Sequence, residues 1–472
     1  MKYPAINPAT VLTDPIATVY RVREDKNNFG PRIGFAYNPH GGVKFLGDGK
    51  TVYHAGFGIF YDVLFMNITD NSQETAPNVQ SPQVSVATGR GAPNASTIVP
   101  GMTPGPIGPT NTEELTTNNL VNPMTYQWNF GIERELPGQV KFSATYVGTR
   151  GSKLFINQQY NYFVNGTRVN PARGPIIARG NFAASEYNGL QIGASHDMRH
   201  GLFLQASYTY SKNLDDGSEV FTLFASPTSY SANLAPGHRG QEWGPSAYDF
   251  RQYLSLAYTW SIPNIPHLSN AGANEIVDIG ARGWQFSAVN AWQSGQYSTF
   301  NLSGFDFNLD GSSANDRPLV GNPQKGLETI GMDGSVLGCT AAPGEGLFDY
   351  GANDVSGACN PVTPADVHWV VPYPYTQANM SQEIGRNSFR NPGYWNMNAA
   401  LQKSFALHIP RMENSALQIR GEAQNLFNHN NVGPLQIDLL DAAPGPGDPF
   451  MNTSAARFDD ERQLRIWAKF VF

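Results

Sequence analysis

Stretches of strictly alternating apolar and polar residues recur along this chain, and they restrict its fold more than any other feature. The last stretch, RQLRIWAKFVF at 462–472, sets Leu464, Ile466 and Phe470 against Arg465 and Lys469. An alternation of period two places successive side chains on opposite faces of a β-strand. The same pattern recurs in VKFSATYVG (140–148), LFLQASYTYS (202–211), LSLAYTW (254–260), WQFSAVNAW (284–292) and LQIRGEAQNLF (417–427). Convincing helical periodicity is absent, so the sequence predicts an all-β protein.

The alternation predicts eleven strands, and the lengths of the connections between them follow a regular order. The strands are expected near 29–38, 51–62, 123–137, 139–155, 186–199, 201–214, 248–263, 281–300, 393–407, 415–428 and 462–472. The long connections are 63–122, 156–185, 215–247, 301–392 and 429–461, and they alternate with the short ones at 39–50, 137–138, 199–201, 264–280 and 408–414. Outer-membrane barrels have short periplasmic turns and long extracellular loops. The sequence therefore predicts a transmembrane antiparallel up-and-down β-barrel.

The composition agrees with such a barrel. Charged residues make up 15% of the 472 residues, against roughly 25% in soluble globular domains. The net charge of -7 and the lack of a basic cluster favour no nucleic-acid partner. Aromatic residues stand near the expected strand ends, where a barrel has its girdles, and the core of a sandwich is the less favoured alternative. These aromatic residues are Tyr126, Trp128, Tyr208, Tyr210, Tyr258, Trp260, Trp284, Trp292 and Trp395.

The two cysteines, Cys339 and Cys359, lie in one stretch rich in Gly, Pro and Asp. A close pair in a loop is typical of a disulfide formed in an oxidising compartment, and two unpaired thiols are the alternative. The N-terminal residues MKYPAINPAT lack the apolar core of a signal peptide. An exported protein needs such a core, so either this is a soluble protein or the sequence begins inside a longer one.

The segment GFDFNLDGSSANDRP (304–318) resembles part of a calcium-binding loop. Asp306, Asn308 and Asp310 alternate before a glycine, which is the spacing of oxygen ligands in such loops. Arg317 stands where the bidentate Glu of the usual motif is expected, and Asp316 could replace that Glu. The alternative is a solvated hairpin tip rich in Asx and Gly. A structural Ca²⁺ ion is therefore the one metal expected, and no cofactor is expected.

Six segments together resemble the C-terminal barrel of TonB-dependent outer-membrane receptors, above all the Oar-like group. They are NNFGPRIGFAYNP (27–39), NPMTYQWNFGIERELP (122–137), YVGTRGSKL (146–154), YNGLQIGASHDMRHGLFLQASYTYSKNLDD (187–216), YDFRQYLSLAYTW (248–260) and GEAQNLFNHNN (421–431). The resemblance covers nearly the whole chain from about residue 27 and implies a location in the outer membrane. It also implies a role for the last strand, in which Trp467, Phe470 and Phe472 would form a signal for the barrel-assembly machinery.

The sequence departs from this family in two respects. Neither the N-terminal plug nor the box that contacts the TonB complex is visible, and the eleven strands are half of the family's 22. We therefore expect residues 1–472 to be the C-terminal portion of one receptor barrel, with plug and N-terminal region absent. A faint strand near 16–23, IATVYRVR, offers the alternative of a small closed barrel.

The function that the resemblance implies is uptake of a bulky extracellular ligand. The barrel wall is expected to contact outer-membrane lipid. The long loops 63–122 and 301–392 are expected to bind the ligand. The TonB complex would act through the missing N-terminal region. Arg420, Glu422, Arg465 and Lys469 are expected to face the lumen, either as a polar lining or as a substrate path. A non-transporting adhesive barrel and a secreted glycan-binding β-protein are the alternatives. No G-x-S-x-G elbow and no catalytic carboxylate pair can be selected, so no enzyme is expected.

Overall fold

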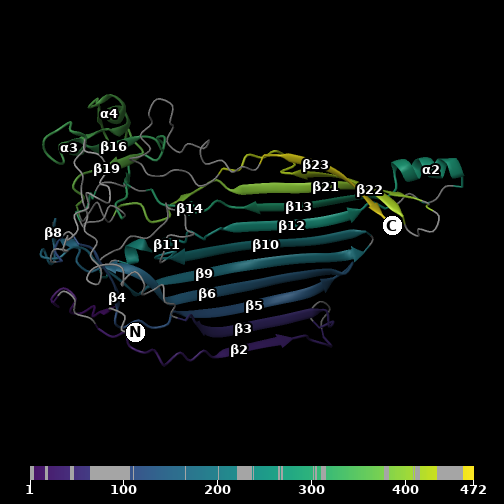
Figure 1. The fold of residues 1–472 in the computed structure, drawn as a ribbon, viewed down its shortest axis with the longest axis horizontal. Coiled ribbons are helices and arrows are strands. Elements are labelled where there is room, and N and C mark those ends of the chain that lie inside the picture. The colour runs from purple at the N-terminus through teal and green to yellow at the C-terminus, as the bar shows by residue number, and fades with distance from the viewer. Residues whose placement is uncertain are drawn as a thin grey trace, which may run out of the picture.

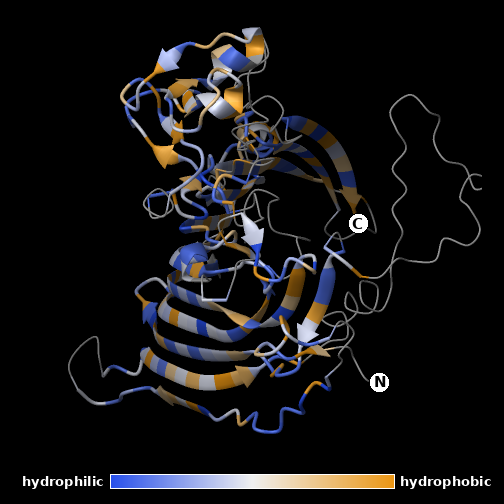
Figure 2. Cartoon of the chain, turned by 90° about the vertical axis from the view of Figure 1, so that its left-hand side faces the viewer, coloured by the Kyte–Doolittle hydropathy of each residue, from blue (hydrophilic) through white to orange (hydrophobic). Residues whose placement is uncertain are grey.

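The computed structural model has one large antiparallel sheet that curves into an open half-barrel (Figure 1, Figure 2). It describes residues 5–15, 20–42, 47–63, 107–219, 236–263, 269–300, 315–376, 382–407, 415–432 and 461–472, apart from 110, 165, 200 and 238, together with 266, 302, 306–309 and 409. Eleven strands follow one another across the sheet in sequence order. The meander predicted from the sequence is therefore confirmed.

All eleven predicted strands are present. They are β2 (Arg32–Tyr37), β3 (Thr51–Tyr61), β5 (Met124–Leu136), β6 (Val140–Gln159), β9 (Ile176–Arg199), β10 (Leu202–Asp215), β12 (Gln252–Ser261), β13 (Trp284–Gln293), β21 (Tyr394–Ala406), β22 (Ala416–Gln424) and β23 (Gln463–Val471). The largest difference is at β9, which begins ten residues before its expected start. Its first part, Ile176 to Arg179, adds a parallel pairing with the short strand β4 (Glu113–Thr117).

The long and short connections lie at opposite ends of the sheet (Figure 1). We call these ends the loop side and the turn side. Short turns such as residues 137–139 join β5 to β6, and residues 200–201 join β9 to β10. Gly138 and Gly201 have φ values of 82° and 78° in these turns, which only glycine adopts without strain. The predicted sorting of the connections by length is confirmed.

The register joins the predicted apolar faces into one surface. Leu202, Trp260, Phe286, Leu401, Gly421 and Ile466 are successive Cα partners across six strands. One position along, Phe203, Thr259, Ser287, Ala400, Glu422 and Arg465 form the neighbouring row on the opposite face. Because directly paired residues point to the same side of a sheet, the sheet has one apolar face and one largely polar face.

The edge strands β2 and β23 are unpaired on their outer sides among the described strands. Tyr20 pairs singly with Ala5, in the short strand β1 (Ala5–Ile6), and β1 pairs in parallel with β4. Residues 20–23 of the faint predicted strand form no strand, and residues 16–19 lie outside the described part. The N-terminal segment therefore adds to the loop side and does not close the sheet.

The connection between β13 and β21, predicted as an open loop, contains a folded unit that we call the loop domain (residues 294–393). Its five-stranded sheet has the order β15 (Leu319–Val320), β19 (Trp369–Val371), β16 (Ile330–Asp333), β17 (Leu347–Asp349), β18 (Pro361–Val362). A ribbon of β14 (Tyr297–Ser298) and β20 (Phe389–Arg390) lies at its base. Phe300, Leu302, Phe307, Met332 and Val371 belong to its buried core. The local excess of Gly and Pro concealed this core, since its residues are spread over about 75 positions.

Helices are few and short, as the predicted all-β class implies. They are α2 (Ala271–Gly280) on the turn side, α3 (Gly334–Leu337) and α4 (Tyr350–Ser356) in the loop domain, and the 3-10 helix η2 (Arg239–Glu242). The remaining short strands are β7 (Phe163–Val164), β8 (Thr167–Arg168) and β11 (Gly244–Pro245). Within the described residues, no helix has the length and apolar character needed to cross a membrane.

Candidate functional site on the loop side

The candidate site is the set of long connections at the loop side, because two of them fold together above one end of the sheet. Side chains from the connection between β10 and β12 contact the loop domain through buried ion pairs. Arg317 Nη2 of the loop domain lies 2.5 Å from Glu242 Oε1, and both side chains are at most 5% exposed. Desolvating two charges is costly unless they pair closely, so the two connections are held together as one body.

Arg386 forms the second part of this contact. It is fully buried, and its Nε donates to the carbonyl oxygen of Glu242 at 2.9 Å. Its Nη2 donates to the carbonyl oxygen of Asp215 at 2.6 Å and also to the Asp215 carboxylate. A Cβ added at Gly244 would lie 2.7 Å from the Arg386 carbonyl oxygen, so the backbones approach too closely for any other residue. The guanidinium group therefore joins the end of β10, the connection after it and the loop domain.

Polar side chains extend this contact at the base of the loop domain. Asn387 Nδ2 donates to the carbonyl oxygen of Pro245 at 2.7 Å. The Asn387 N–H donates to Thr299 Oγ1 at 2.9 Å, which holds the two chain segments entering and leaving the domain side by side. Asn391 Nδ2 donates to Ser298 Oγ at 2.7 Å. These bonds satisfy buried polar groups and orient the loop domain relative to the sheet.

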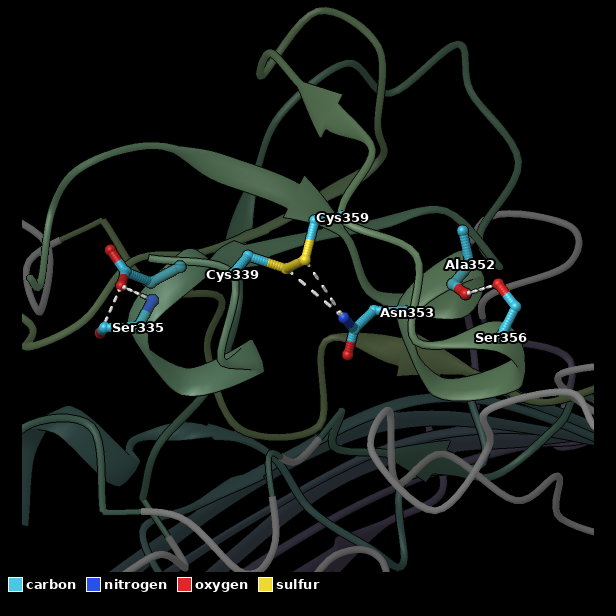
Figure 3. Close-up of a disulfide and its surroundings, with 7 residues drawn as sticks. Ser335, Cys339, Ala352, Asn353, Ser356 and Cys359 are labelled. Atoms are coloured by element: carbon cyan, nitrogen blue, oxygen red, sulfur yellow. Dashed lines mark hydrogen bonds between the residues drawn. A yellow bond between two sulfur atoms is a disulfide. The ribbon is translucent and has the colours of Figure 1, made fainter. Parts of the chain in front are cut away.

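The predicted disulfide is confirmed. Cys339 follows α3, Cys359 follows α4, and their sulfurs are bonded (Figure 3). Asn353 Nδ2 approaches Cys339 Sγ at 3.4 Å. Asp333 caps α3 by accepting the Ser335 N–H at 2.9 Å, and its second oxygen accepts the Gly344 N–H at 2.8 Å. The outermost part of the loop domain is thus closed both covalently and by helix capping.

A second buried ion pair fixes the N-terminal segment on the loop side. Arg173 Nε and Nη2 donate to the two oxygens of Glu113 at 2.9 and 2.5 Å, a bidentate geometry. Arg173 Nη1 also donates to the carbonyl oxygen of Val11 at 2.5 Å. Beside it, burial raises the pKa of Tyr160 to about 12. This cluster stabilises β1 and β4 against the start of β9.

The residues of the expected calcium loop are only partly described. Asp316 is buried, and its Oδ1 accepts the Asn308 N–H at 3.1 Å, so the two ends of the loop meet. Asp306 lies nearby in sequence, whereas Asp310 lies outside the described residues. Burial raises the pKa of Tyr375, as do the nearby carboxylates of Glu383 and Asp316. In the part of the chain that the structure describes, no three His, Cys, Asp or Glu side chains are grouped to hold a metal.

The four charges expected to face the lumen do share the polar face. Arg420 Nε lies 2.8 Å from Glu422 Oε1 on the same strand. Glu422 is the Cα partner of Arg465, and Lys469 is the partner of Gln418. Arg420 and Glu422 also line a cavity of about 260 Å³ whose other polar side chains include Asn398 and Ser287. The register puts the four charges on one face of the sheet, and their place in a lumen stays a prediction.

The residues of the expected assembly signal lie on both faces of the last strand. Trp467 is on the polar face, and its ring lies 5.7 Å from the Arg420 guanidinium carbon. Phe470 and Phe472 stack on the apolar face with their centroids 5.7 Å apart, and Phe472 is 81% exposed. The strand therefore ends on an exposed aromatic pair.

Sequence reasoning missed the buried ion pairs. No local pattern in the sequence indicates that these charged residues are buried and paired: Glu242, Asp215, Arg386, Glu113 and Arg173. Their partners are 60 to 171 positions away, and single charged residues within Gly- and Pro-rich segments carry no periodic signal. Only pairing information between distant positions could have found them.

The chain was compared with protein-family models, curated proteins and solved structures. A family model described as outer membrane beta barrel domain matches residues 9–463. The outer membrane transporter YddB from Escherichia coli is similar over 90% of this chain and 39% of its own, with 10% identity and a TM-score of 0.40. A mutant ferric enterobactin receptor from Pseudomonas aeruginosa, in complex with enterobactin, is similar over 94% of this chain and 40% of its own, with 10% identity and a TM-score of 0.42.

The ferric-catecholate import receptor Fiu from E. coli is similar over 93% of this chain and 34% of its own, with 8% identity and a TM-score of 0.36. This chain thus spans at most about two fifths of the length of these three proteins. No curated protein matches the sequence.

Proposed function

Because this chain belongs to the outer membrane beta barrel domain family, we propose that it supplies wall and outer loops of a TonB-dependent receptor of the Oar-like group. The chain is located in the outer membrane, with its apolar face toward lipid, its turns toward the periplasm and its long connections outside. The secreted glycan-binding alternative does not fit this location. Uptake of a bulky ligand is the function proposed for the complete receptor.

The height of the apolar face supports a membrane-spanning wall. On β6, Phe142 and Arg150 point to the same side and are eight residues apart. Eight residues correspond to roughly 27 Å along a strand, and to roughly 20 Å along the membrane normal at a tilt of ~40°. Arg150 pairs with Glu186 at the loop side, where the polar surface begins. The apolar band is therefore close to the thickness that lipid requires.

The direction of the edge strands supports a larger barrel. All ten pairings along the path from β2 to β23 are antiparallel, so the two edge strands run in the same direction. Unpaired edges are costly in lipid. To close the barrel with antiparallel pairs, an odd number of further strands is needed, and the first and last of them must run opposite to β2 and β23. A second copy in the same membrane orientation has edge strands that run parallel to β2 and β23, so it cannot supply these antiparallel pairs. We therefore propose that the remaining strands come from another part of the same receptor.

One observation carries the proposed ligand-binding role: the two long connections are joined by buried Arg386 and Arg317 into a rigid body at the extracellular end. A preorganised surface binds without the cost of ordering flexible loops. The candidate loop 63–122 cannot be compared with it, since residues 64–106 lie outside the described part. We therefore propose the loop domain as the main ligand-binding element.

Transport assays on whole cells test this proposal. Cells with and without the complete gene are compared for accumulation of ⁵⁵Fe-enterobactin, ⁵⁷Co-cobalamin and labelled oligosaccharides and peptides, with a protonophore as the control for energy coupling. We expect accumulation of one probe to depend on the gene and to stop with the protonophore. Replacing residues 301–392 by a short Gly-Ser linker should abolish binding of that probe. The barrel should still be folded in the membrane, as judged by an electrophoretic mobility that changes on heating (heat-modifiable mobility). Retained binding would refute the assignment to the loop domain.

The disulfide-closed loop domain also favours a second candidate, a surface or adhesive barrel that does not transport. A stable outward domain is suited to contact with other surfaces. This candidate predicts that no probe accumulates and that deletion of residues 301–392 reduces cell attachment. The transport assay and an attachment assay on the same strains distinguish the two functions.

A further inference from the structure

The helix α2 lies at the turn side of the sheet (Figure 1), and a hydrogen bond joins its end to β13. Its C-terminal carbonyl oxygen at Gly280 accepts the indole N–H of Trp284 at 2.9 Å. Trp284 is the Cα partner of Lys403, and Lys403 is the partner of Ile419. All three residues lie on the face that carries Phe286 and Leu401. The end of α2 therefore sits against the outer wall of the half-barrel, on the side that faces lipid.

Lys403 explains how this position is maintained. It is a cation on the apolar face, yet it is only 4% exposed. Its ammonium group donates to the carbonyl oxygen of Asp278 at 2.8 Å and to that of Arg282, and it lies 5.6 Å from the centre of the Trp284 ring. Carbonyl groups at a helix C-terminus stabilise a cation. They replace the water that this charge would lack beside hydrocarbon.

The inner side of α2 is satisfied by further contacts. Asn270 caps the helix by accepting the Ala273 N–H at 3.1 Å. Arg282 pairs with Asp278 at 2.5 Å, and its Nη2 donates to the carbonyl oxygen of Pro266 at 2.8 Å. Arg282 thus joins the residues before and after α2 to the side of the helix that carries Asp278.

The opposite side of α2 exposes two isoleucines. Ile276 is 73% exposed and Ile279 is 60% exposed, and residues three apart lie on the same side of a helix. The helix rises ~1.5 Å per residue, so Ile276 is roughly 6 Å along the axis from Gly280, which contacts the Trp284 girdle position. The interfacial layer outside the hydrocarbon is roughly 5–8 Å thick on each side of a bilayer. Both isoleucines are thus within reach of this layer.

We propose that α2 is an interfacial helix whose Ile276 and Ile279 insert among phospholipids of the periplasmic leaflet. The helix adjoins the lipid-facing wall at Trp284, which donates to its C-terminal carbonyl, and this favours lipid over a periplasmic protein as the occupant. Trp residues and amphipathic helices concentrate at this depth of a membrane. The proposal depends on the location in the outer membrane and is independent of any transport function.

Fluorescence quenching on the complete protein tests this assignment. Both cysteines of residues 1–472 are in the disulfide, so Ile279→Cys adds one free thiol for an NBD label, and the protein without this substitution gives the background labelling. The labelled protein is placed in nanodiscs of 3:1 phosphatidylethanolamine and phosphatidylglycerol containing a headgroup-level nitroxide lipid. The control is His40→Cys, an exposed position in the turn between β2 and β3 at the same end. Heat-modifiable mobility verifies that each variant is folded.

We expect the label at 279 to be quenched severalfold more by the nitroxide lipid than the label at 40, and less by iodide. Ile276→Cys should give the same result, and it replaces the first variant if that one fails to fold. Equal quenching of positions 279 and 40 by iodide would overturn the proposal. Protection that arises only after purified periplasmic proteins are added would assign the surface to a protein partner and would also overturn it.

Discussion

Arg317 and Glu242 form a buried ion pair of 2.5 Å although they are 75 positions apart. The pair connects the loop domain with the connection between β10 and β12. Arg386, which also belongs to the loop domain, contacts the same glutamate, with its Nε 3.8 Å from Glu242 Oε2. Two cations thus share one carboxylate in a place where water does not reach. This arrangement holds the extracellular connections in a single position.

Removing one partner should loosen the loop domain. Arg386→Met leaves Asp215 and Glu242 buried with less charge compensation, which costs about 3–5 kcal/mol for a buried pair. We expect faster hydrogen exchange at the base of the loop domain and faster proteolysis within it, with unchanged exchange in β5 and β6. Arg390→Met changes an exposed arginine nearby and serves as the control. Equal protection in both variants would contradict the proposed coupling.

The disulfide should stabilise the loop domain alone. Its two cysteines are 20 positions apart, and closing a loop of this length contributes about 3 kcal/mol in the chain-entropy view. The double variant Cys339→Ser/Cys359→Ser should raise hydrogen exchange in α3 and α4 and leave the heat-modifiable barrel intact. Dithiothreitol should have the same effect on the natural protein and none on the variant. Loss of the folded barrel in either case would show that the domain is not independent.

The final aromatic residue should matter for assembly. Phe472→Ser removes an apolar side chain worth about 2 kcal/mol when buried against lipid, and it removes the stacking partner of Phe470. We expect most of the folded protein to be lost from isolated outer membranes, as judged by heat-modifiable mobility. Val471→Ser alters the preceding residue on the other face and should have little effect. Similar losses in the two variants would argue against a terminal signal.

The segment around Asp306 should bind Ca²⁺, and a direct binding measurement tests this prediction. Oxygen ligands in extracellular calcium modules give dissociation constants on the order of 10⁻⁴–10⁻³ M. Titration calorimetry of the complete protein with CaCl₂ should show heat that Asp306→Asn/Asn308→Ala abolishes, whereas MgCl₂ should show less. The absence of heat at millimolar calcium would remove this ion from the loop domain.

Acid should weaken one turn of the loop domain. Thr363 donates its Oγ–H and its N–H to Asp366 Oδ2 at 2.6 and 3.0 Å, and these bonds lower the pKa of the Asp366 carboxyl below its ordinary value of 3.8. Its contribution is complete above that value and is lost as the pH falls through the lowered pKa. Asp366→Asn should therefore increase hydrogen exchange at Thr363 at neutral pH, and this difference should shrink as the pH falls below 3.8. A difference that persists in acid would contradict this origin.

Much of the sheet could be predicted because its signal is local. Alternation over nine or ten residues identified strands such as β10 and β22, and the row from Leu202 to Ile466 shows that their apolar faces coincide. Pro137 and Gly138 marked the turn between β5 and β6, where Gly138 has a φ of 82°. Lipid imposes the same demand on every strand, so each strand carries the pattern independently of the others.

The helix α2 and the loop domain could not be predicted in this way. The inner contacts of α2 depend on Lys403, which lies 125 positions from Asp278, and ten residues are too few for a periodic pattern to be decisive. The core of the loop domain combines Phe300 with Val371 and Trp369, and no short window contains them together. Here, stability depends on pairs distant in sequence, and propensity is a weak guide.

The sequence by itself determined the strands, their faces, the sorting of the connections and the cysteine pair, because each of these follows from spacing between near neighbours. Only the tertiary structure decided that Arg386 joins three segments, that Lys403 holds α2 on the lipid-facing wall, and that the longest connection folds on its own core. The physical reason is that a charge or an apolar side chain is buried favourably only where suitable partners contact it in space. Those partners are often distant in sequence, so no local pattern identifies them.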